Sequence, residues 1–244
     1  MGGIMDRKHA LITGASRGIG RALAEEFAAD GYNLTITCIN NTETLHELSI
    51  YLEEEHGITC SVFTGDLSDY KMAEELFRDI TRIDVLINNA GISYHGLIQD
   101  MLPSEWDYVI STNLNSTFYT SRLAIPLMLK QKMGKILNIS SVWGEHGASM
   151  ETAYSASKGG LNAFTKALAR ELAPSNIQVN AIACGMIDTD MNNIFNIEEK
   201  ESIISEIPAD RMGQPHEVAR LALQICTGNE YLTGQIITLD GGWT

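Results

Sequence analysis

The sequence predicts one α/β domain built on a doubly wound parallel sheet of about seven strands, with helices on both faces. Short apolar segments that do not alternate with polar residues recur along the chain, as in strands that are buried on both faces. Stretches with apolar residues at helical spacing separate them, which favours parallel pairing of the strands. At 244 residues, 44% of them hydrophobic, the chain is long enough for one large domain.

Seven segments are expected to form the strands because each is a short and mostly apolar run. In chain order they are HALIT (9–13), YNLTITCI (32–39), ITCSVFTG (58–65), IDVLIN (83–88), KILNIS (135–140), IQVNAIA (177–183) and QIITL (235–239). The first is followed by IGRALAEEFAADG, which has helical spacing and ends at Gly31, a typical helix stop. Another helix is expected from about residue 215.

Residues 188–212 form the longest insertion between these elements. Its apolar side chains belong to Met191, Ile194, Phe195 and Ile197. They either cover an apolar pocket as a lid or pack as a surface helix, and both interpretations stay open.

The charge of the chain bears on its partners. A formal net charge of −14 argues against general nucleic-acid binding, which requires a basic surface. Residues 121–135 are a local exception, because they carry Arg122, Lys130, Lys132 and Lys135 and no acidic residue. They form either a small basic patch or a helix C-terminus whose dipole favours cations.

The sequence also predicts a cytoplasmic protein without a membrane span. No run approaches the roughly 18 apolar residues of a transmembrane helix. The start, MGGIMDRKHA, lacks the apolar region of a signal peptide, and Asp6 stands where a myristoylation signal requires Ser or Thr. Cys38, Cys60, Cys184 and Cys226 are widely spaced with no nearby His, so we expect reduced core thiols and no metal site.

A glycine-rich turn follows the first expected strand. In TGASRGIG (13–20), Gly14 would permit a tight turn, Gly18 would let a pyrophosphate approach the backbone, and Gly20 would permit close packing of helix on strand. The N-terminus of the following helix would offer N–H donors and a positive dipole to phosphate. No G-K-[ST] follows, so the loop is not that of a nucleoside-triphosphate P-loop.

The cofactor can be predicted in part. An acid about 20 residues after the glycines would bind an adenosine ribose 2′-hydroxyl. The second strand instead ends in Cys38, Ile39, Asn40 and Asn41. Arg17 lies in the glycine loop and could pair with a 2′-phosphate, which favours NADP(H) over NAD(H). The alternative is that Arg17 is a solvated loop residue.

The segment YSASK (154–158) pairs a phenol with an ammonium group four residues later. On a helix the two side chains share one face, and a nearby lysine favours tyrosinate. Lowering the tyrosine pKa by about 3 units requires roughly 4 kcal/mol. A unit charge about 4 Å away supplies about that at an effective dielectric constant near 20. Tyr154 and Lys158 could therefore form a general acid that works near neutral pH, or they could belong to an ordinary amphipathic helix.

With the glycine loop, NNAG (88–91) and YSASK in one alternating chain, the sequence resembles the short-chain dehydrogenase/reductase family over nearly all of residues 8–244. The resemblance implies a single Rossmann-type domain spanning 1–244. Residues 8–130 would mainly bind the cofactor, and 131–244 would hold the catalytic residues and a substrate lid near 188–212. It also implies a homotetramer, with the helices around 104–131 and 154–173 in one interface and the last strand in another.

The resemblance implies roles for individual residues. Tyr154 would donate a proton to a carbonyl oxygen, Lys158 would lower its pKa and hold the nicotinamide ribose, and Asn113 would anchor a water in a proton relay. Ser141 would hydrogen-bond the same carbonyl oxygen, since it lies thirteen residues before Tyr154 and so fits the family pattern better than Ser140. The cofactor would contact Gly14, Ser16, Arg17, Gly18, Ile19, Gly20, Asn40, Asp66, Leu67, Asn89, Ala90, Gly91, Tyr154, Lys158, Gly185, Ile187 and Thr189.

One position departs from the family pattern. Where the family usually has Pro-Gly after the sixth strand, this chain has Cys184 and Gly185. Loss of the proline frees the backbone φ angle. We expect weaker cofactor affinity rather than lost activity.

The substrate is expected to be a ketone that is reduced to a secondary alcohol. The chain most resembles bacterial 3-oxoacyl-acyl-carrier-protein reductases in length and in its ending, YLTGQIITLDGGW. The two basic positions attributed there to carrier docking align with Lys132 and Ser175, so one charge is absent. A strongly acidic chain also repels an acidic carrier protein.

Three alternatives stay open. SSVWGEHGASMETAYSASKGG resembles reductases of 5-aminopentanone attached to elongation factor P, and Glu151 could pair with an ammonium group or simply complement a helix dipole. Trp143, Met150 and Phe195 could wall a pocket for a hydroxysteroid or another small ketone. The same fold could also serve a non-catalytic NADP(H) sensor, although the chain retains Asn113, Ser141, Tyr154 and Lys158.

Overall fold

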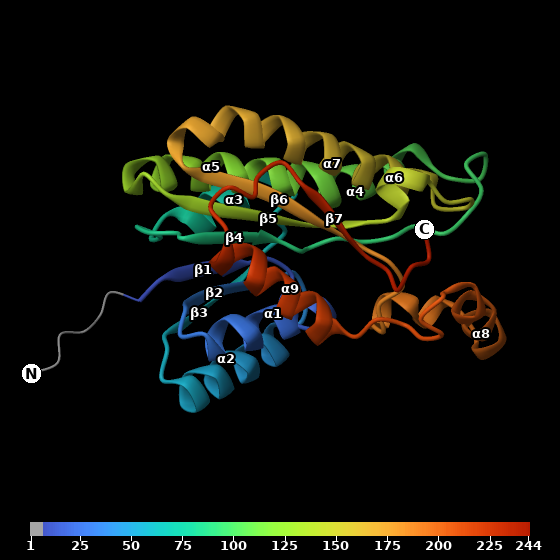
Figure 1. Ribbon diagram of the computed structural model, residues 1–244, viewed down its shortest axis with the longest axis horizontal. Helices are drawn as coiled ribbons and strands as arrows, with labels where there is room; N and C mark the ends of the chain where they lie inside the picture. The colour runs from blue at the N-terminus through green and yellow to red at the C-terminus, as the bar shows by residue number, and fades with distance from the viewer. Residues whose placement is uncertain (1–6) are drawn as a thin grey trace, which may run out of the picture.

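Seven parallel strands form one sheet in the structure, a computed structural model that describes residues 7–244 (Figure 1). Their order across the sheet is β3-β2-β1-β4-β5-β6-β7, and every neighbouring pair is parallel. The expectations about a signal peptide and a lipid anchor rest on residues 1–10, of which 1–6 lie outside the described residues. The predicted fold class is confirmed.

Each predicted strand is present, and no end differs from the predicted one by more than two residues. The bounds are β1 His9–Ile12, β2 Asn33–Cys38, β3 Cys60–Thr64, β4 Val85–Asn88, β5 Gly134–Ser141, β6 Ile177–Cys184 and β7 Ile236–Leu239. At the start of β4 the Asp84 carboxylate accepts hydrogen bonds from His9 N and Arg82 Nε, both at 2.8 Å. The side chain of Asp84 thus fastens the beginnings of β1 and β4 together.

Two hydrophobic cores, one on each face of the sheet, hold the helices in place. Helices α1 (Gly18–Ala29), α2 (Thr42–His56) and α9 (Pro215–Gly228) contribute buried apolar residues to one core. Helices α3 (Tyr70–Phe77), α5 (Ser116–Gln131) and α7 (Thr152–Leu172) contribute to the other. Figure 1 shows these two layers on opposite sides of the sheet. Strands covered on both faces explain the continuous apolar runs in the sequence.

Shorter elements complete the chain. They are α4 (Pro103–Ile110), a π-helical turn η1 (Ser111–Asn115), α6 (Trp143–His146), η2 (Ala173–Ser175), η3 (Asp190–Ile194) and α8 (Ile197–Glu206). The last two lie within the long insertion at 188–212. In the part of the chain that the structure describes, no helix combines the length and apolar character needed to cross a membrane. The four cysteines are buried and unpaired, as expected for core thiols.

The cations of residues 121–135 occupy several structural positions. Arg122 donates to the Tyr70 hydroxyl at 3.2 Å, and Lys135 lies within β5. Lys130 is in the last turn of α5 and Lys132 follows it with a left-handed backbone conformation, φ 58°. For Lys130 and Lys132 the structure therefore supports the interpretation as cations at a helix C-terminus.

The strand order reverses between β1 and β4: β2 and β3 lie on one side of β1, and β4 to β7 lie on the other. Ligands of open α/β sheets bind beyond the carboxyl ends of the strands at such a switch point. The glycine loop follows β1 and the NNAG segment includes the end of β4. Both sequence motifs are therefore brought to this edge by the strand order.

Candidate active site

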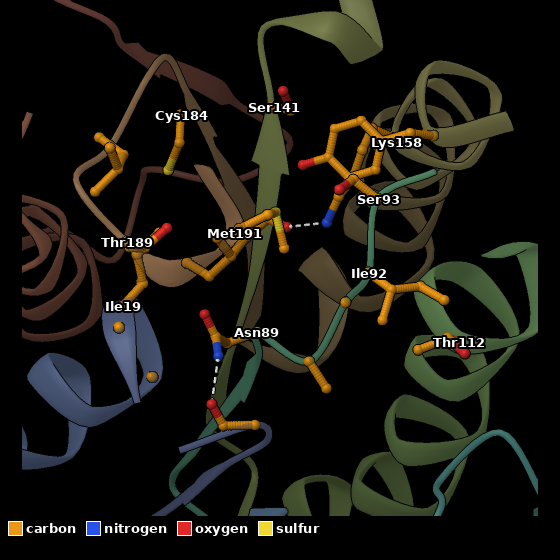
Figure 2. A pocket seen from close by; sticks show the side chains of 18 of the residues that line it. Ile19, Asn89, Ile92, Ser93, Thr112, Ser141, Lys158, Cys184, Thr189 and Met191 are labelled. Carbon is orange, nitrogen blue, oxygen red and sulfur yellow. Dashed lines mark hydrogen bonds between the residues drawn. The ribbon is translucent and has the colours of Figure 1, made fainter. Parts of the chain in front are cut away.

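One cavity of about 770 Å³ lies beyond the carboxyl ends of the strands. All the residues expected to bind the cofactor line it, from Gly14 in the glycine loop to Thr189 in the insertion, and so does Ser141. Asn113 does not, since it is buried beneath the wall at 1% exposure. In Figure 2, Ser141 and Lys158 lie at one end, with Ile19 on one side and Thr112 on the other.

The glycine loop forms a close-fitting turn at the floor of this cavity. Gly14 has a left-handed backbone, φ 68°, and a Cβ atom there would lie 2.9 Å from Ala90 Cα, so only glycine fits without strain. Helix α1 begins at Gly18, and no side chain caps its N-terminus. Its first N–H groups can therefore receive an anionic group, which fits the pyrophosphate of a dinucleotide.

The turns after β1 and β4 are joined by the side chains of Thr13 and Asn89. Asn89 Nδ2 donates to the carbonyl oxygens of Thr13 at 2.9 Å and Gly14 at 3.0 Å. The Thr13 hydroxyl accepts from the backbone N–H groups of Asn89 and Ala90, both at 3.0 Å. These bonds satisfy buried polar groups and fix the relative position of the two predicted nucleotide-binding segments.

The end expected to bind adenosine lacks an acid after β2, as predicted, and Asn40 is exposed there. Asp66, at the end of the β3 turn, accepts a hydrogen bond from Ser68 N at 2.9 Å. Arg17 Nη1 lies 3.5 Å from Asp190 Oδ2, and both side chains are more than half exposed. The predicted phosphate ligand thus already has an anionic partner, which comes from the insertion.

The insertion at 188–212 crosses over the glycine loop. A Cβ atom at Gly18 would lie 3.2 Å from Thr189 Cγ2. Met191, Ile194 and Phe195 line the cavity, whereas Ile197 is 76% exposed and does not line it. Three of the four apolar residues therefore line the pocket, whereas helix α8 in the same insertion buries none of its residues. Features of both interpretations are present, and the lid stays a prediction.

Three of the four predicted catalytic side chains come from β5 and α7. Ser141 is the last residue of β5, and Tyr154 and Lys158 share one face of α7 near its N-terminus. Lys158 Nζ donates to the carbonyl oxygen of Ile139 at 2.8 Å and lies 5.6 Å from the centroid of the Tyr154 ring. Figure 2 shows the lysine extending toward β5, where that bond holds its amine.

Asn113 supports this end of the cavity from below. It lies in the π-helical turn η1, a local widening that often accompanies functional sites. Its amide accepts from Ile92 N at 2.8 Å and donates to Ile92 O at 2.8 Å and to Ser157 Oγ at 2.9 Å. A Cβ at Gly91 would lie 3.2 Å from Asn113 Oδ1, so the glycine permits this approach.

Burial, more than charge, governs the protonation of the Tyr154–Lys158 pair. Burial raises the pKa of Tyr154 above its ordinary value, and hydrogen bonding to Ser141 acts in the opposite direction. Burial lowers the pKa of Lys158 to about 8. The expectation of a lowered tyrosine pKa is therefore wrong for the protein without cofactor, because removing both groups from water disfavours both ions.

Cys184 does not loosen the end of β6. Its carbonyl oxygen accepts from Val142 N at 3.0 Å, and Gly185 N donates to Leu239 O at 2.9 Å. The residue is 5% exposed, and burial raises the pKa of its thiol to about 12. Its effect on cofactor affinity stays a prediction.

Comparison with known proteins identifies the family. A model described as short chain dehydrogenase matches residues 8–200. The chain belongs to this family. The predicted resemblance is confirmed, and this short-chain dehydrogenase is an oxidoreductase that acts on CH–OH and C=O groups with a nicotinamide cofactor.

Two relatives cover almost the whole sequence. The dehydrogenase is 41% identical to the uncharacterized oxidoreductase YmfI of Bacillus subtilis. The match covers 238 residues, 97% of this chain and 98% of YmfI. It is 39% identical to the 3-oxoacyl-acyl-carrier-protein reductase FabG of Chlamydia trachomatis. This match covers 247 residues and 99% of each chain.

Solved structures share the fold. YwfH, an NADPH dependent reductase involved in bacilysin biosynthesis, has a TM-score of 0.93 at 28% identity, over 98% of this chain and 99% of YwfH. The 3-oxoacyl-acyl-carrier-protein reductase of Brucella melitensis has a TM-score of 0.92 at 34% identity, over 97% and 91% of the two chains.

The cavity of this dehydrogenase also includes residues that the sequence did not point to. Trp243, near the C-terminus, meets Trp143 with ring centroids 4.9 Å apart, and its Nε1 lies 3.5 Å from Glu206 Oε2. Thr112 and Ser93 line the cavity as well. Thr112 is the sequence neighbour of the predicted site residue Asn113, so its position near the site could have been expected. No sequence pattern connects Trp243 with Trp143.

Proposed function

We propose that this chain is an NADPH-dependent reductase that converts a ketone to a secondary alcohol. One observation carries the proposal: Ser141, Tyr154 and Lys158 line the same cavity as the glycine loop. The absence of a carboxylate after β2 and the presence of Arg17 in the loop support the phosphorylated cofactor.

The bound cofactor would supply a hydride to the carbonyl carbon, and the protein would manage the charge that grows on oxygen. Tyr154 holds its proton at neutral pH, since burial raises its pKa, so it can donate that proton to the carbonyl oxygen. Ser141 would hydrogen-bond the same oxygen. Lys158, held by Ile139 O, would keep a positive charge beside the tyrosine and bind the ribose hydroxyls. Asn113 would position the Gly91–Ile92 segment and anchor a relay water.

The test is ketone-dependent loss of NADPH absorbance by wild type and by Tyr154→Phe. Loss of the proton donor should lower kcat by at least about 100-fold while NADPH binding is retained. Tyr231→Phe is the matched control because Tyr231 is 96% exposed and should behave as wild type. A Tyr154→Phe enzyme with most of its kcat would refute the catalytic assignment, and a wild-type enzyme that binds NADPH but reduces no ketone would favour the sensor interpretation.

The first substrate class to test is a 3-oxoacyl thioester on an acyl carrier protein. FabG of Chlamydia trachomatis, 39% identical to this chain, supports this choice. The acidity of the insertion argues against it: residues 188–212 hold seven acidic and two basic residues, which would repel an acidic carrier. The absence of a cation at Ser175 has the same effect.

A second candidate is a ketone that carries an ammonium group, such as 5-aminopentanone on elongation factor P. Glu151 lines the cavity, and burial raises the pKa of its carboxyl group. Trp143, Trp243 and Glu206 line the same cavity. Aromatic rings and carboxylates together attract cations, so these residues favour an ammonium-bearing substrate over an anionic one.

Glu151→Gln separates the two substrate classes. For modified elongation factor P we expect kcat/KM to fall about tenfold, because a charge-assisted hydrogen bond is lost. The same substrate with its amine acetylated is the control and should show equal rates with both enzymes. Turnover of the thioester alone by wild type would exclude the amino-ketone reading.

We also infer that the chain forms the homotetramer expected from its sequence. Tyr108 and Phe118, in α4 and α5, are 50% and 46% exposed, so each helix presents an aromatic side chain that could pack against a second copy. Strand β7 lies at the edge of the sheet with one neighbour only, so its other edge can pair with a second copy. Light scattering after gel filtration would give the mass, and a monomeric mass would refute this inference.

A further inference from the structure

The segment 240–244 contributes an aromatic side chain to the catalytic end of the cavity. Trp243 and Trp143 both line the cavity, with ring centroids 4.9 Å apart and ring planes at 64°. The backbone N–H of Trp143 donates to Ser141 Oγ at 3.2 Å. Figure 1 shows the end of the chain beside α6, the helix that Trp143 begins. The two indoles therefore form an angled aromatic wall next to the hydroxyl that would bind the carbonyl oxygen.

Hydrogen bonds on both sides of Trp243 fix its backbone. The Asp240 carboxylate accepts from the backbone N–H groups of Gly242 at 2.9 Å and Thr244 at 2.8 Å. It also accepts from the Thr244 hydroxyl at 3.0 Å. The segment is thus folded around one carboxylate, and the indole of Trp243 is held at the cavity before any substrate binds. Such preorganisation lowers the entropy that binding must overcome.

The same segment is attached to the end of the insertion. Gly241 O accepts from Ala209 N at 3.1 Å, and a Cβ atom at Gly241 would lie 2.9 Å from Ile207 Cγ2. Trp243 Nε1 lies 3.5 Å from Glu206 Oε2, and Glu206 lines the cavity. The edge of the indole therefore lies beside a carboxylate from the last turn of α8, and the two side chains reach the cavity together.

The charge at this end of the cavity is negative. Among the described residues that line the cavity, the cations are Arg17 and Lys158. Arg17 lies 3.5 Å from Asp190, and Lys158 donates to a backbone carbonyl oxygen of β5. In the described part of the chain no cation lies within ion-pairing distance of Glu206. An aromatic face with a carboxylate at its edge attracts a cation, so Trp243 and Glu206 together provide a site for one.

We propose that Trp243 and Glu206 bind an alkylammonium group at the far end of the ketone substrate, which makes Trp243 a specificity-determining residue. The inference rests on the proposed ketone reductase and assigns recognition of the charge to two residues that the sequence did not indicate. The carbonyl would lie at Ser141, the carbon chain along Trp143, and the ammonium group against the face of Trp243 beside Glu206. Alkylammonium groups suit such a site because they bind aromatic faces and need few hydrogen bonds.

The test compares two ketones of equal shape with NADPH. One is methyl propyl ketone with a trimethylammonium group at the end of the propyl chain, and the other carries a neutral tert-butyl group there. The quantity measured is the ratio of their kcat/KM values, in which a general loss of activity cancels. We expect wild type to favour the cationic ketone by about tenfold. Trp243→Leu should lower this ratio about three- to tenfold, and Glu206→Gln about two- to fivefold because its carboxylate is exposed.

Three further variants make the comparison specific. Trp243→Phe keeps an aromatic face and should retain most of the preference for the cation. Trp106→Leu and Glu201→Gln are the matched controls, because Trp106 in α4 and Glu201 in α8 do not line the cavity. Both controls should keep the wild-type ratio.

Two results would overturn the inference: equal kcat/KM values for the two ketones in wild type, or a ratio that neither Trp243→Leu nor Glu206→Gln lowers. Reduction of the neutral ketone but not of the cationic one would overturn it as well. Failure of wild type to reduce any ketone with NADPH would instead overturn the proposed reductase.

Discussion

Lys158 is expected to make the stability of the protein without cofactor depend on pH. Burial lowers the pKa of this lysine to about 8 from an ordinary value of 10.5. The folded pKa lies below the unfolded one, so between pH 8 and pH 10.5 the unfolded chain binds a proton that the folded chain has released. Stability therefore rises with pH across this window. The full difference is about 3 kcal/mol, and about 2 kcal/mol of it develops between pH 7 and roughly pH 9.5.

Urea unfolding of wild type and Lys158→Met at these two pH values would measure the effect. The free energy of unfolding of wild type should rise, relative to that of Lys158→Met, by about 2 kcal/mol on going to the higher pH. Other titrating groups cancel in this difference. Lys166→Met is the control, because Lys166 is an exposed lysine of the same helix, and it should follow wild type at both values. If the free energy of unfolding changed equally with pH in wild type and in Lys158→Met, the reasoning that burial of charged Lys158 lowers stability would be refuted.

Three further predictions concern the cofactor end of the cavity. Arg17→Ala should raise the KM for NADPH more than the KM for NADH, and equal changes for the two cofactors would show that Arg17 is not the phosphate ligand. Asp190→Asn should lower the KM for NADPH by up to about fivefold, because it removes the carboxylate 3.5 Å from Arg17. Gly14→Ala should lower the melting temperature more than Gly31→Ala, since both have positive φ but a Cβ at Gly31 meets nothing within 4 Å; similar losses would contradict the close contact with Ala90. Cys184, with a thiol pKa of about 12, should resist alkylation by iodoacetamide at about pH 8 in the folded protein, and rapid labelling at that position by mass spectrometry would contradict its burial.

The sequence was informative about the fold because its strands are buried on both faces. Such strands appear in the sequence as continuous apolar runs, and all seven were predicted with small errors at their ends. The glycine loop was equally informative, since its residues act through local backbone conformation. Contacts between distant segments were not predictable in this way. The Arg17–Asp190 and Trp143–Trp243 pairs join residues far apart in the chain, and no periodicity or motif connects them.

The insertion illustrates an intermediate case. Its composition identified the apolar residues that could cover a pocket but did not distinguish a lid from a surface helix. In the structure Met191, Ile194 and Phe195 line the cavity, and Ile197 at the start of the surface helix α8 faces solvent, so the segment combines features of both. The ring of Phe195 also meets that of His95 edge-on, with centroids 5.8 Å apart. Only tertiary contacts of this kind could assign the segment to the pocket.

The pKa of Tyr154 shows why a charge argument made on sequence alone gave the wrong sign. The argument placed a unit charge about 4 Å from the phenol in a medium of effective dielectric near 20 and neglected the transfer of both groups out of water. In the structure burial is the largest influence on each, and it raises the pKa of the tyrosine while lowering that of the lysine. A reductase does not need tyrosinate, because the form that donates a proton is the neutral phenol. The same burial that contradicts the expected low pKa therefore keeps Tyr154 in the protonation state that ketone reduction requires.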